Sequence, residues 1–219
     1  MPEIIVVANQ KGGVGKTTTS INLAAALHKN NHKTLLVDLD SQGNATSASG
    51  LNRSTEKASV YDVLMGLKNI EECFVTSEHD GFTLLPSNSD LMAAEIEMLN
   101  IQNRESVLKE KINSISREFD YILIDSPPSM NILTLNALAA ANKIIIPVQC
   151  EYYALEGMSG LLESIYKIKE TINPNLQIKG VLRTMFDSRN SLSVEVSAQL
   201  KKYFGDKLFW TFIPRNVRL

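Results

Sequence analysis

Short apolar runs alternate with longer segments of helical periodicity along this chain. Buried strands are predicted where the apolar runs are continuous, at residues 4–8, 33–40, 82–86, 119–125, 143–148 and 178–185. Helices are predicted where apolar residues recur three or four positions apart, at residues 16–28, 59–66, 91–99, 107–115, 161–172 and 192–203. Strands that alternate with helices indicate a mostly parallel, twisted sheet with helices on both faces. Residues 1–219 are therefore expected to form a single α/β domain.

Two of the predicted helices carry apolar stripes that are expected to pack against the sheet. The first stripe consists of Leu161, Ile165, Ile168 and Ile172. The second consists of Leu192, Val196, Leu200 and Tyr203, and Gly205 is expected to end that helix.

A glycine-rich stretch joins the first predicted strand to the first predicted helix. It reads Gln10-Lys11-Gly12-Gly13-Val14-Gly15-Lys16-Thr17-Thr18. Glycines let backbone N–H groups point inward at oxyanions, and the helix N-terminus adds partial positive charge. Lys16 can reach the β- and γ-phosphates of a nucleotide, and the Thr17 hydroxyl can ligate Mg²⁺. The stretch therefore predicts the phosphate-binding loop of a P-loop NTPase. The alternative, a dinucleotide-binding fingerprint, would need a third glycine at the position that Thr18 occupies, so we set it aside.

Carboxylates end two further predicted strands. Asp38 and Asp40 lie at the end of one strand, and Asp125 lies at the end of another. Loops at the carboxyl ends of parallel strands line the ligand crevice, so these acids are expected beside the phosphate-binding loop. The apolar run before Asp125 has the form of a Walker B strand, whose acid binds Mg²⁺ through water. Asp38 and Asp40 could instead only cap a neighbouring helix, but their position at a strand end favours a functional role for Asp40.

The form Lys-Gly-Gly-x-Gly-Lys-Thr-Thr resembles the deviant Walker A loop of the partition-ATPase superfamily. That superfamily includes the segregation ATPases ParA and Soj, the division-site ATPase MinD and the nitrogenase iron protein. The resemblance covers almost the whole chain and is closer to ParA and Soj than to MinD. Besides the loop it is carried by Asp38–Asn44, Asp125–Pro128, Pro147–Gly157 and Ile213–Leu219. Ser41 departs from the family pattern, in which proline is usual at this position.

The resemblance implies roles for individual residues of the ATP site. Lys11 is expected to reach across a nucleotide-sandwiched homodimer to the partner's phosphates, as an arginine finger does. Asp40 is expected to orient or deprotonate the attacking water, and Asp38 to support the magnesium shell or the loop. Glu151 is expected near the ribose or the dimer seam. Pro214 and Asn216 are expected to contact the adenine. Thr17 and Asp125 are expected to bind Mg²⁺. The expected catalytic residues are Lys11, Lys16 and Asp40. The expected ATP-binding residues are Lys11, Lys16, Glu151, Pro214 and Asn216, together with Gly12, Gly13, Val14, Gly15, Thr17 and Thr18.

The resemblance also implies a biological role. It predicts a slow ATPase that dimerises with ATP, binds DNA without sequence preference and is stimulated by DNA and by a ParB-type centromere-binding partner in chromosome or plasmid segregation. Arg189 and Arg218 match the family's DNA-binding positions. One alternative is a MinD-like, membrane-associated division-site ATPase. Another is a regulatory module that holds ATP without meaningful turnover.

Composition narrows these classes further. The 219 residues are 44% hydrophobic and 21% charged, which suits one globular domain with a sizeable core. The net charge is −2, so contact with DNA has to come from a local basic patch. Cys73 and Cys150 lie far apart without metal-ligand spacing, which predicts reduced, buried thiols and argues against an iron–sulfur cluster.

The location of the protein is predicted from the same composition. No apolar run approaches the roughly 18 residues that span a bilayer, and no signal peptide precedes the first strand, so we expect a cytoplasmic protein without membrane contact. The resemblance to ParA and Soj further implies association with the bacterial nucleoid. Family members usually continue with a last helix beyond the position of Leu219, and we expect that helix to be missing from this sequence.

Overall fold

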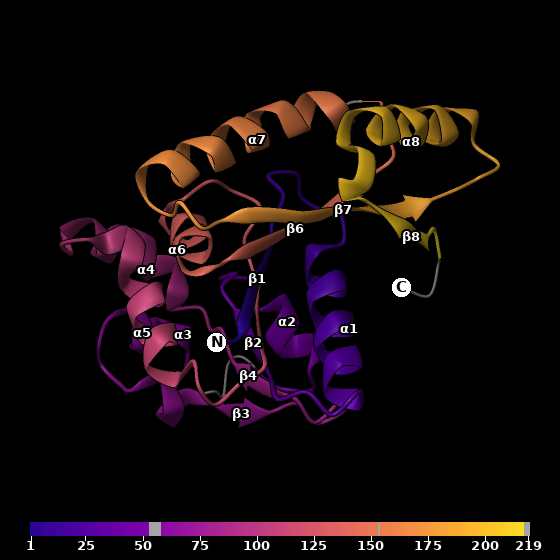
Figure 1. The fold of residues 1–219 in the computed structure, drawn as a ribbon. Coiled ribbons are helices and arrows are strands. Elements are labelled where there is room, and N and C mark those ends of the chain that lie inside the picture. The colour runs from indigo at the N-terminus through magenta and orange to yellow at the C-terminus, as the bar shows by residue number, and fades with distance from the viewer. Residues whose placement is uncertain (53–57, 153, 217–219) are drawn as a thin grey trace.

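An eight-stranded sheet runs through the computed structural model, which describes residues 1–52, 58–152 and 154–216 (Figure 1). The strand order is β3-β4-β2-β5-β1-β6-β7-β8, and every pairing is parallel except that of β3 with β4. The strands are β1 (Glu3–Val7), β2 (Thr34–Asp38), β3 (Val75–Thr76), β4 (Thr83–Leu85), β5 (Tyr121–Asp125), β6 (Lys143–Gln149), β7 (Gln177–Phe186) and β8 (Leu208–Pro214). The predicted α/β fold with a mostly parallel sheet is confirmed.

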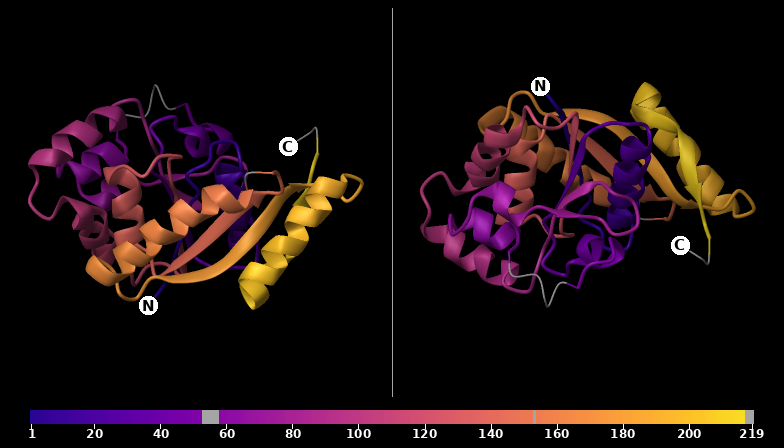
Figure 2. Two further views of the ribbon diagram at one scale, coloured as in Figure 1. Left: turned by 90° about the horizontal axis from the view of Figure 1, so that it is seen from above. Right: turned by 90° about the horizontal axis from the view of Figure 1, so that it is seen from below.

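Helices cover both faces of the sheet, as the sequence predicted. Helices α1 and α2 pack on one face and α3 to α8 on the other, where α7 and α8 run along the outer strands β6 and β7 (Figures 1 and 2). The helices are α1 (Lys16–Lys29), α2 (Asn44–Ala48), α3 (Val60–Leu64), α4 (Leu91–Glu97), α5 (Val107–Ile115), α6 (Ile132–Ala140), α7 (Ala154–Thr171) and α8 (Ser191–Phe204). Short 3₁₀ turns are η1 (Ile70–Cys73), η2 (Met98–Asn100), η3 (Arg104–Ser106) and η4 (Gly205–Lys207).

The central strands are apolar on both sides because both faces of the sheet are covered. In β1, Ile4 and Val6 point into the larger core under α3 to α8, whereas Ile5 points into the smaller core under α1. In β5, Ile122 and Ile124 alternate with Leu123 in the same way. This is why the strands appear in the sequence as continuous apolar runs rather than as alternating patterns.

Several elements had no signal in the sequence that we recognised. Helix α6 is buried almost all round, so it shows no amphipathic pattern, although it is the helix that follows β5. Strand β8 lies at the edge of the sheet and exposes 90% of Trp210, so it shows no clean alternation. The short elements α2 and β3 were likewise not predicted.

The two apolar stripes gave different outcomes. In α7, Leu161, Ile165 and Ile168 are buried as predicted. In α8 the prediction was half wrong, because Leu192 is 39% and Tyr203 is 69% exposed. The buried face of α8 is Ser193, Val196, Ser197 and Leu200. Helix α8 lies over the outer strands and makes only a narrow contact there, so small polar residues complete its packed face (Figure 2).

Both cysteines are buried free thiols, as the sequence predicted. Burial raises the pKa of Cys73 and of Cys150, so both side chains stay protonated and behave as small apolar groups.

Candidate nucleotide-binding site

The phosphate-binding loop lies between the carboxyl end of β1 and the first turn of α1. Gly13 and Gly15 have φ angles of 72° and 85°, a left-handed conformation that favours glycine at both positions. No side chain of the described residues caps the start of α1. Its first N–H groups are therefore available to an anion, in line with the prediction of a phosphate site.

Strand register brings the predicted acids to this loop. Asp125, the last residue of β5, pairs with Val7 of β1 on one side and with Asp38 of β2 on the other. Neighbouring strands lie about 4.8 Å apart, so the phosphate-binding loop, Asp125 and Asp38 share one edge of the sheet. The cluster that the sequence predicted at this edge is therefore assembled in the structure.

Asp125 offers an unsatisfied buried oxygen. Its Oδ1 accepts a hydrogen bond from the Ser20 hydroxyl at 2.9 Å, but no hydrogen bond to its buried Oδ2 is found among the described residues. Burial and the neighbouring Asp38 carboxylate raise the pKa of Asp125 to about 7, whereas the hydroxyls of Thr17 and Ser20 lower it. A buried carboxylate oxygen without a donor suits a hard divalent cation. The residues at this edge therefore fit Mg²⁺.

Lys16 is the buried lysine of the loop. Its side chain is 7% exposed, and Nζ donates a hydrogen bond to the Lys11 carbonyl at 3.3 Å. Burial lowers the pKa of Lys16, while the carboxylates of Asp125 and Asp40 raise it. The ammonium group is thus held between the loop and the acids, where the phosphates of a nucleotide would lie.

Lys11 occupies a different environment from Lys16. Its Nζ forms an ion pair with Glu151 Oε2 at 2.6 Å, and the two side chains are 46% and 48% exposed. The Lys11 N–H donates to Asn9 Oδ1, and Asn9 Nδ2 donates to the Pro147 carbonyl, so the base of the loop is tied to β6. Glu151, predicted near the ribose or the dimer seam, therefore contacts the lysine that was predicted to cross that seam.

Asp38 supports the segment that follows β2, as one of its two predicted roles required. Its carboxylate is buried and accepts hydrogen bonds from the backbone and the hydroxyl of Thr46. Burial raises the pKa of Asp38 to about 6, while the bonds from Thr46 lower it. Asp40 is 8% exposed and accepts a hydrogen bond from the Gln42 N–H at 2.9 Å. Asp38 thus supports the segment after β2, whereas Asp40 lines the large groove beside the phosphate-binding loop.

Sequence reasoning missed two residues that hold the site together. Ser20 lies one helical turn after Lys16 and donates to Asp125, so its spacing could have identified it. Thr184 is the other, and its hydroxyl donates to the Val14 carbonyl at 2.8 Å. That contact joins β7 to the loop across 170 residues of sequence, and no local pattern signals it.

A single large groove connects the phosphate-binding loop with the C-terminal strand. Its volume is about 1460 Å³, and its lining includes Gly12, Gly13, Gly15, Lys16, Thr17, Thr18, Asp40, Pro214 and Asn216. The predicted adenine contacts Pro214 and Asn216 thus line the same groove as the predicted phosphate contacts. Contact of these two residues with adenine stays a prediction.

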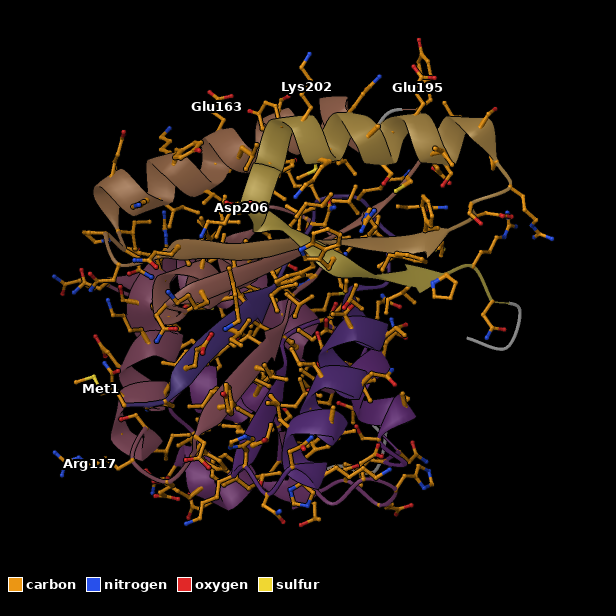
Figure 3. All side chains as sticks on the ribbon, turned by 45° about the vertical axis from the view of Figure 1, so that its right-hand side comes forward. Met1, Arg117, Glu163, Glu195, Lys202 and Asp206 are labelled. Carbon is orange, nitrogen blue, oxygen red and sulfur yellow. The ribbon has the colours of Figure 1, made fainter. Side chains whose placement is uncertain are left out.

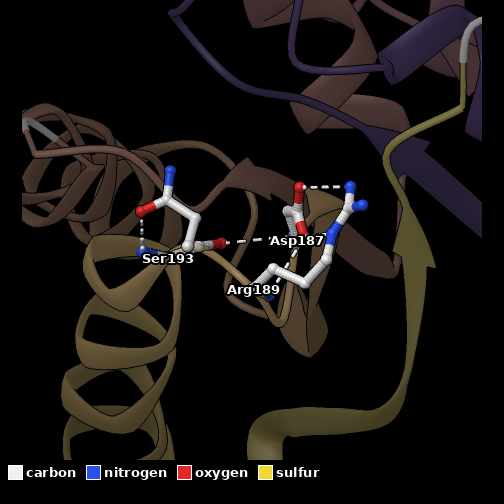
Figure 4. A network of polar contacts seen from close by, with 4 residues as sticks. Asp187, Arg189 and Ser193 are labelled. Carbon is white, nitrogen blue, oxygen red and sulfur yellow. Dashed lines mark hydrogen bonds and ion pairs between the residues drawn. The ribbon is translucent and has the colours of Figure 1, made fainter.

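Of the two predicted DNA-binding arginines, Arg189 does not line this groove. Arg189 is 89% exposed and makes a two-pronged ion pair with Asp187, with both N–O distances at 3.0 Å (Figure 4). The pair lowers the pKa of Asp187 and raises the pKa of Arg189. Arg218 lies outside the residues that the structure describes. Arg183 binds Ser197 and the Phe209 and Trp210 carbonyls, so it joins β7 to α8 and β8.

Comparisons with known proteins agree with this geometry. A family described as AAA domain matches residues 2–178. The chain is 47% identical over 216 residues to the chromosome partitioning protein ParA of Myxococcus xanthus, covering 99% of this chain and 76% of that protein. It is 46% identical over 219 residues to the sporulation initiation inhibitor protein Soj of Bacillus subtilis, covering 100% of this chain and 87% of that protein.

Solved structures show the same fold with nucleotides. A Mycobacterium smegmatis protein described as cobyrinic acid a,c-diamide synthase, with bound ADP and magnesium, matches with a TM-score of 0.93 and 39% identity over 99% of this chain and 88% of that chain. A putative plasmid partition protein from Borrelia burgdorferi B31 bound to AMPPNP matches with a TM-score of 0.85 and 28% identity over 100% of this chain and 87% of that chain.

Fold and site together define a P-loop ATPase built on a mostly parallel sheet. Relatives that match over nearly the whole chain narrow this class. The chain belongs to the ParA/Soj family of chromosome partitioning ATPases. The MinD-like alternative is not favoured, since these relatives are partitioning proteins. In the part of the chain that the structure describes, no helix is both long enough and apolar enough to cross a bilayer.

Proposed function

We propose that this ATPase dimerises around two molecules of Mg·ATP and binds DNA without sequence preference while it is dimeric. A ParB-type partner then stimulates hydrolysis and releases the DNA, so that the protein serves in segregation on the nucleoid. The observation that carries this proposal is the contrast between the two lysines of the loop. Lys16 is buried within its own site, whereas Lys11 lies outside it, half exposed and held by Glu151.

The position of Lys11 suits a group that serves a second subunit. An ion pair between half-exposed side chains contributes at most about 1 kcal/mol, so a triphosphate with several negative charges can displace Glu151. The long side chain of Lys11 can then reach outward from the loop. In the dimer each Lys11 would neutralise charge on the phosphates bound by the partner, as an arginine finger does.

The other site residues supply the remaining chemistry. Lys16 and the N-terminus of α1 neutralise the phosphates, and Asp40 accepts a hydrogen bond from the attacking water. Thr17 and Asp125 would hold Mg²⁺, and the bound ion would offset negative charge on the phosphates. Pro214 and Asn216 contact the adenine.

DNA binding depends on exposed basic residues on the side of β7, α8 and β8. Arg189 would exchange Asp187 for a DNA phosphate, and Arg218 would add a second contact. The outer face of α8 has mixed charge, because Lys202 and Glu195 both point away from the body (Figure 3). The surface of one subunit is therefore weakly basic at most. Doubling it in a dimer would make DNA binding dependent on ATP and sensitive to salt.

Substitution of Lys11 tests the proposed function. Lys11→Ala should bind nucleotide with the affinity of the wild type but stay monomeric with ATP, as measured by light scattering. Lys33→Ala is the control, because that exposed lysine precedes β2 at the opposite end of the sheet. A stable ATP-dependent dimer of Lys11→Ala would contradict the cross-subunit role.

A further inference from the structure

The backbone of Asp40 is held by a hydrogen-bonded ring that includes two hydroxyl residues outside the known motifs. Ser87 follows β4 and is completely buried. Its hydroxyl donates to the main-chain carbonyl of Asp40 at 2.8 Å, across 47 residues of sequence. The same carbonyl accepts the Gly43 N–H at 2.8 Å. The peptide group that follows Asp40 is therefore fixed from two directions.

Thr46 closes this ring from the other side. Its backbone N–H and its hydroxyl both donate to Asp38 Oδ2 at 2.7 Å. Its hydroxyl oxygen also accepts the Ser87 N–H at 2.9 Å. Asp38 Oδ1 in turn accepts the Asp40 N–H at 3.3 Å. The ring thus runs from the Asp40 carbonyl through Ser87, Thr46 and Asp38 back to the Asp40 N–H.

Every hydrogen bond of the ring joins two residues of this chain. Thr46 and Asp38 are 0% exposed, as is Ser87, so water does not compete for their bonds. Helix α2, which contains Thr46, has only five residues and could not hold the segment after β2 by its own helical bonds. The bonds of the ring join the ends of β2 and β4 to this helix. None of them requires a nucleotide or a second subunit.

The side chain of Asp40 depends on this ring for its position. Among the described residues, the hydrogen bond found to its carboxylate is the local contact from the Gln42 N–H, which orients the carboxylate relative to the turn but not relative to the phosphate-binding loop. A group that positions an attacking water must be placed to within a fraction of an ångström, and a misplacement of about 1 Å can cost on the order of 100-fold in rate.

We propose that Ser87 and Thr46 are positioning residues for ATP hydrolysis, which set the rate by holding the backbone of Asp40. This inference rests on the proposed role of Asp40 as the group that orients the attacking water. Neither Ser87 nor Thr46 lines the groove beside the phosphate-binding loop. Removal of their hydroxyls should therefore lower kcat and leave the KM for ATP nearly unchanged.

The test compares Ser87→Ala with Ser49→Ala. Ser87→Ala should lower kcat on the order of 10-fold or more, and change the KM for ATP by less than about 2-fold. Ser49 is the matched control, because its buried hydroxyl bonds the Ala45 carbonyl beside α2 but lies outside the ring. Ser49→Ala should keep the kcat of the wild type. A normal kcat in Ser87→Ala, or a loss of ATP affinity as large as the loss in kcat, would overturn the proposal.

Conservative substitution of Thr46 separates a positioning role from a folding defect. Thr46→Ser keeps the hydroxyl and should retain most of the activity, whereas Thr46→Val removes the hydroxyl's bonds to Asp38 and Ser87, leaves the backbone N–H bond to Asp38, and should lose most of the activity. Each variant is also unfolded in urea. Equal loss of activity in Thr46→Ser and Thr46→Val, with both folded, would contradict the ring.

A double-variant cycle distinguishes failure of this inference from failure of the proposed function. Asp40→Ala alone should slow turnover at least about 100-fold, and Ser87→Ala in that background should cause no further loss of the residual rate. If Asp40→Ala turns over ATP like the wild type, the role of Asp40 itself is wrong. If Asp40→Ala is inactive but Ser87→Ala is fully active, only the positioning role of Ser87 is wrong.

Discussion

The acids of the site and its exposed lysine, Lys11, are held in opposite ways. Asp38 and Asp125 are completely buried, and the ring around Asp40 closes within the folded chain. The Lys11 side chain is half exposed, and among the described residues it is held at its ammonium group by Glu151, 140 residues away. Buried hydrogen bonds are costly to break, whereas an exposed ion pair is exchanged at a cost of about 1 kcal/mol or less. The backbone of Asp40, the proposed water-positioning residue, is thus fixed by buried bonds, whereas the ion pair that holds the Lys11 side chain can be exchanged.

Removal of the buried lysine should have the largest effect on binding. Lys16→Ala should weaken ATP binding on the order of 100-fold, because a charge-assisted hydrogen bond of about 3 kcal/mol to the phosphates is lost. Lys29→Ala, in the last turn of the same helix, is the control. The measurement is an isothermal titration with ATP and Mg²⁺, and wild-type affinity in Lys16→Ala would contradict the assignment of the loop.

Removal of Asp40 should affect turnover alone. Asp40→Ala should bind ATP normally but hydrolyse it at least about 100-fold more slowly, which is the usual contribution of a positioned acid or base. Dimer should then accumulate in light scattering, since ATP persists. Phosphate release at the wild-type rate would show that another group orients the water.

The buried acids should make the stability of the nucleotide-free, metal-free protein depend on pH. The pKa of Asp38 is raised to about 6 and that of Asp125 to about 7, against an unfolded value of about 4. The folded state therefore binds protons more tightly than the unfolded state, and this part of the stability is present below about pH 4 and lost as the pH rises through 6 to 7. Lys16 and Asp40 carry the other charges near Asp125.

Urea unfolding at pH 5 and pH 7.5, without nucleotide or Mg²⁺, measures this dependence. Asp125→Asn has no carboxyl at that position, so the difference in unfolding free energy between the two pH values should be smaller than in the wild type. An equal difference in the two proteins would mean that Asp125 does not titrate as its burial requires.

Release of the exposed lysine should have the smallest effect. Glu151→Gln removes the charge that holds Lys11, so the ATP-dependent dimer should form at a protein concentration up to about 5-fold lower, equivalent to about 1 kcal/mol. Dimerisation is followed by analytical ultracentrifugation. Weaker dimerisation would instead indicate that Glu151 itself contributes to the seam.

Much of this site could be predicted because its parts lie in local patterns. The phosphate-binding loop and the acids at the ends of β2 and β5 each follow a continuous apolar strand, and parallel topology brings strand ends together. The ring around Asp40 and the Lys11–Glu151 pair could not be predicted, since each joins residues that are far apart in the sequence. Helix α6 was missed for another physical reason, because burial on all sides removes the periodicity that marks a helix.

Mixing two inactive variants tests the central claim, that each subunit completes the site of the other, most directly. Lys11→Ala keeps Asp40, and Asp40→Ala keeps Lys11. In a mixed dimer the Lys11→Ala subunit has its own Asp40 and receives the lysine of its partner. One of the two sites is complete in each mixed dimer, so the mixture should hydrolyse ATP well above the rate of either variant alone, up to about half of the wild-type rate per mixed dimer. If the mixture stays as inactive as either variant alone, Lys11 acts within its own subunit and the account is wrong.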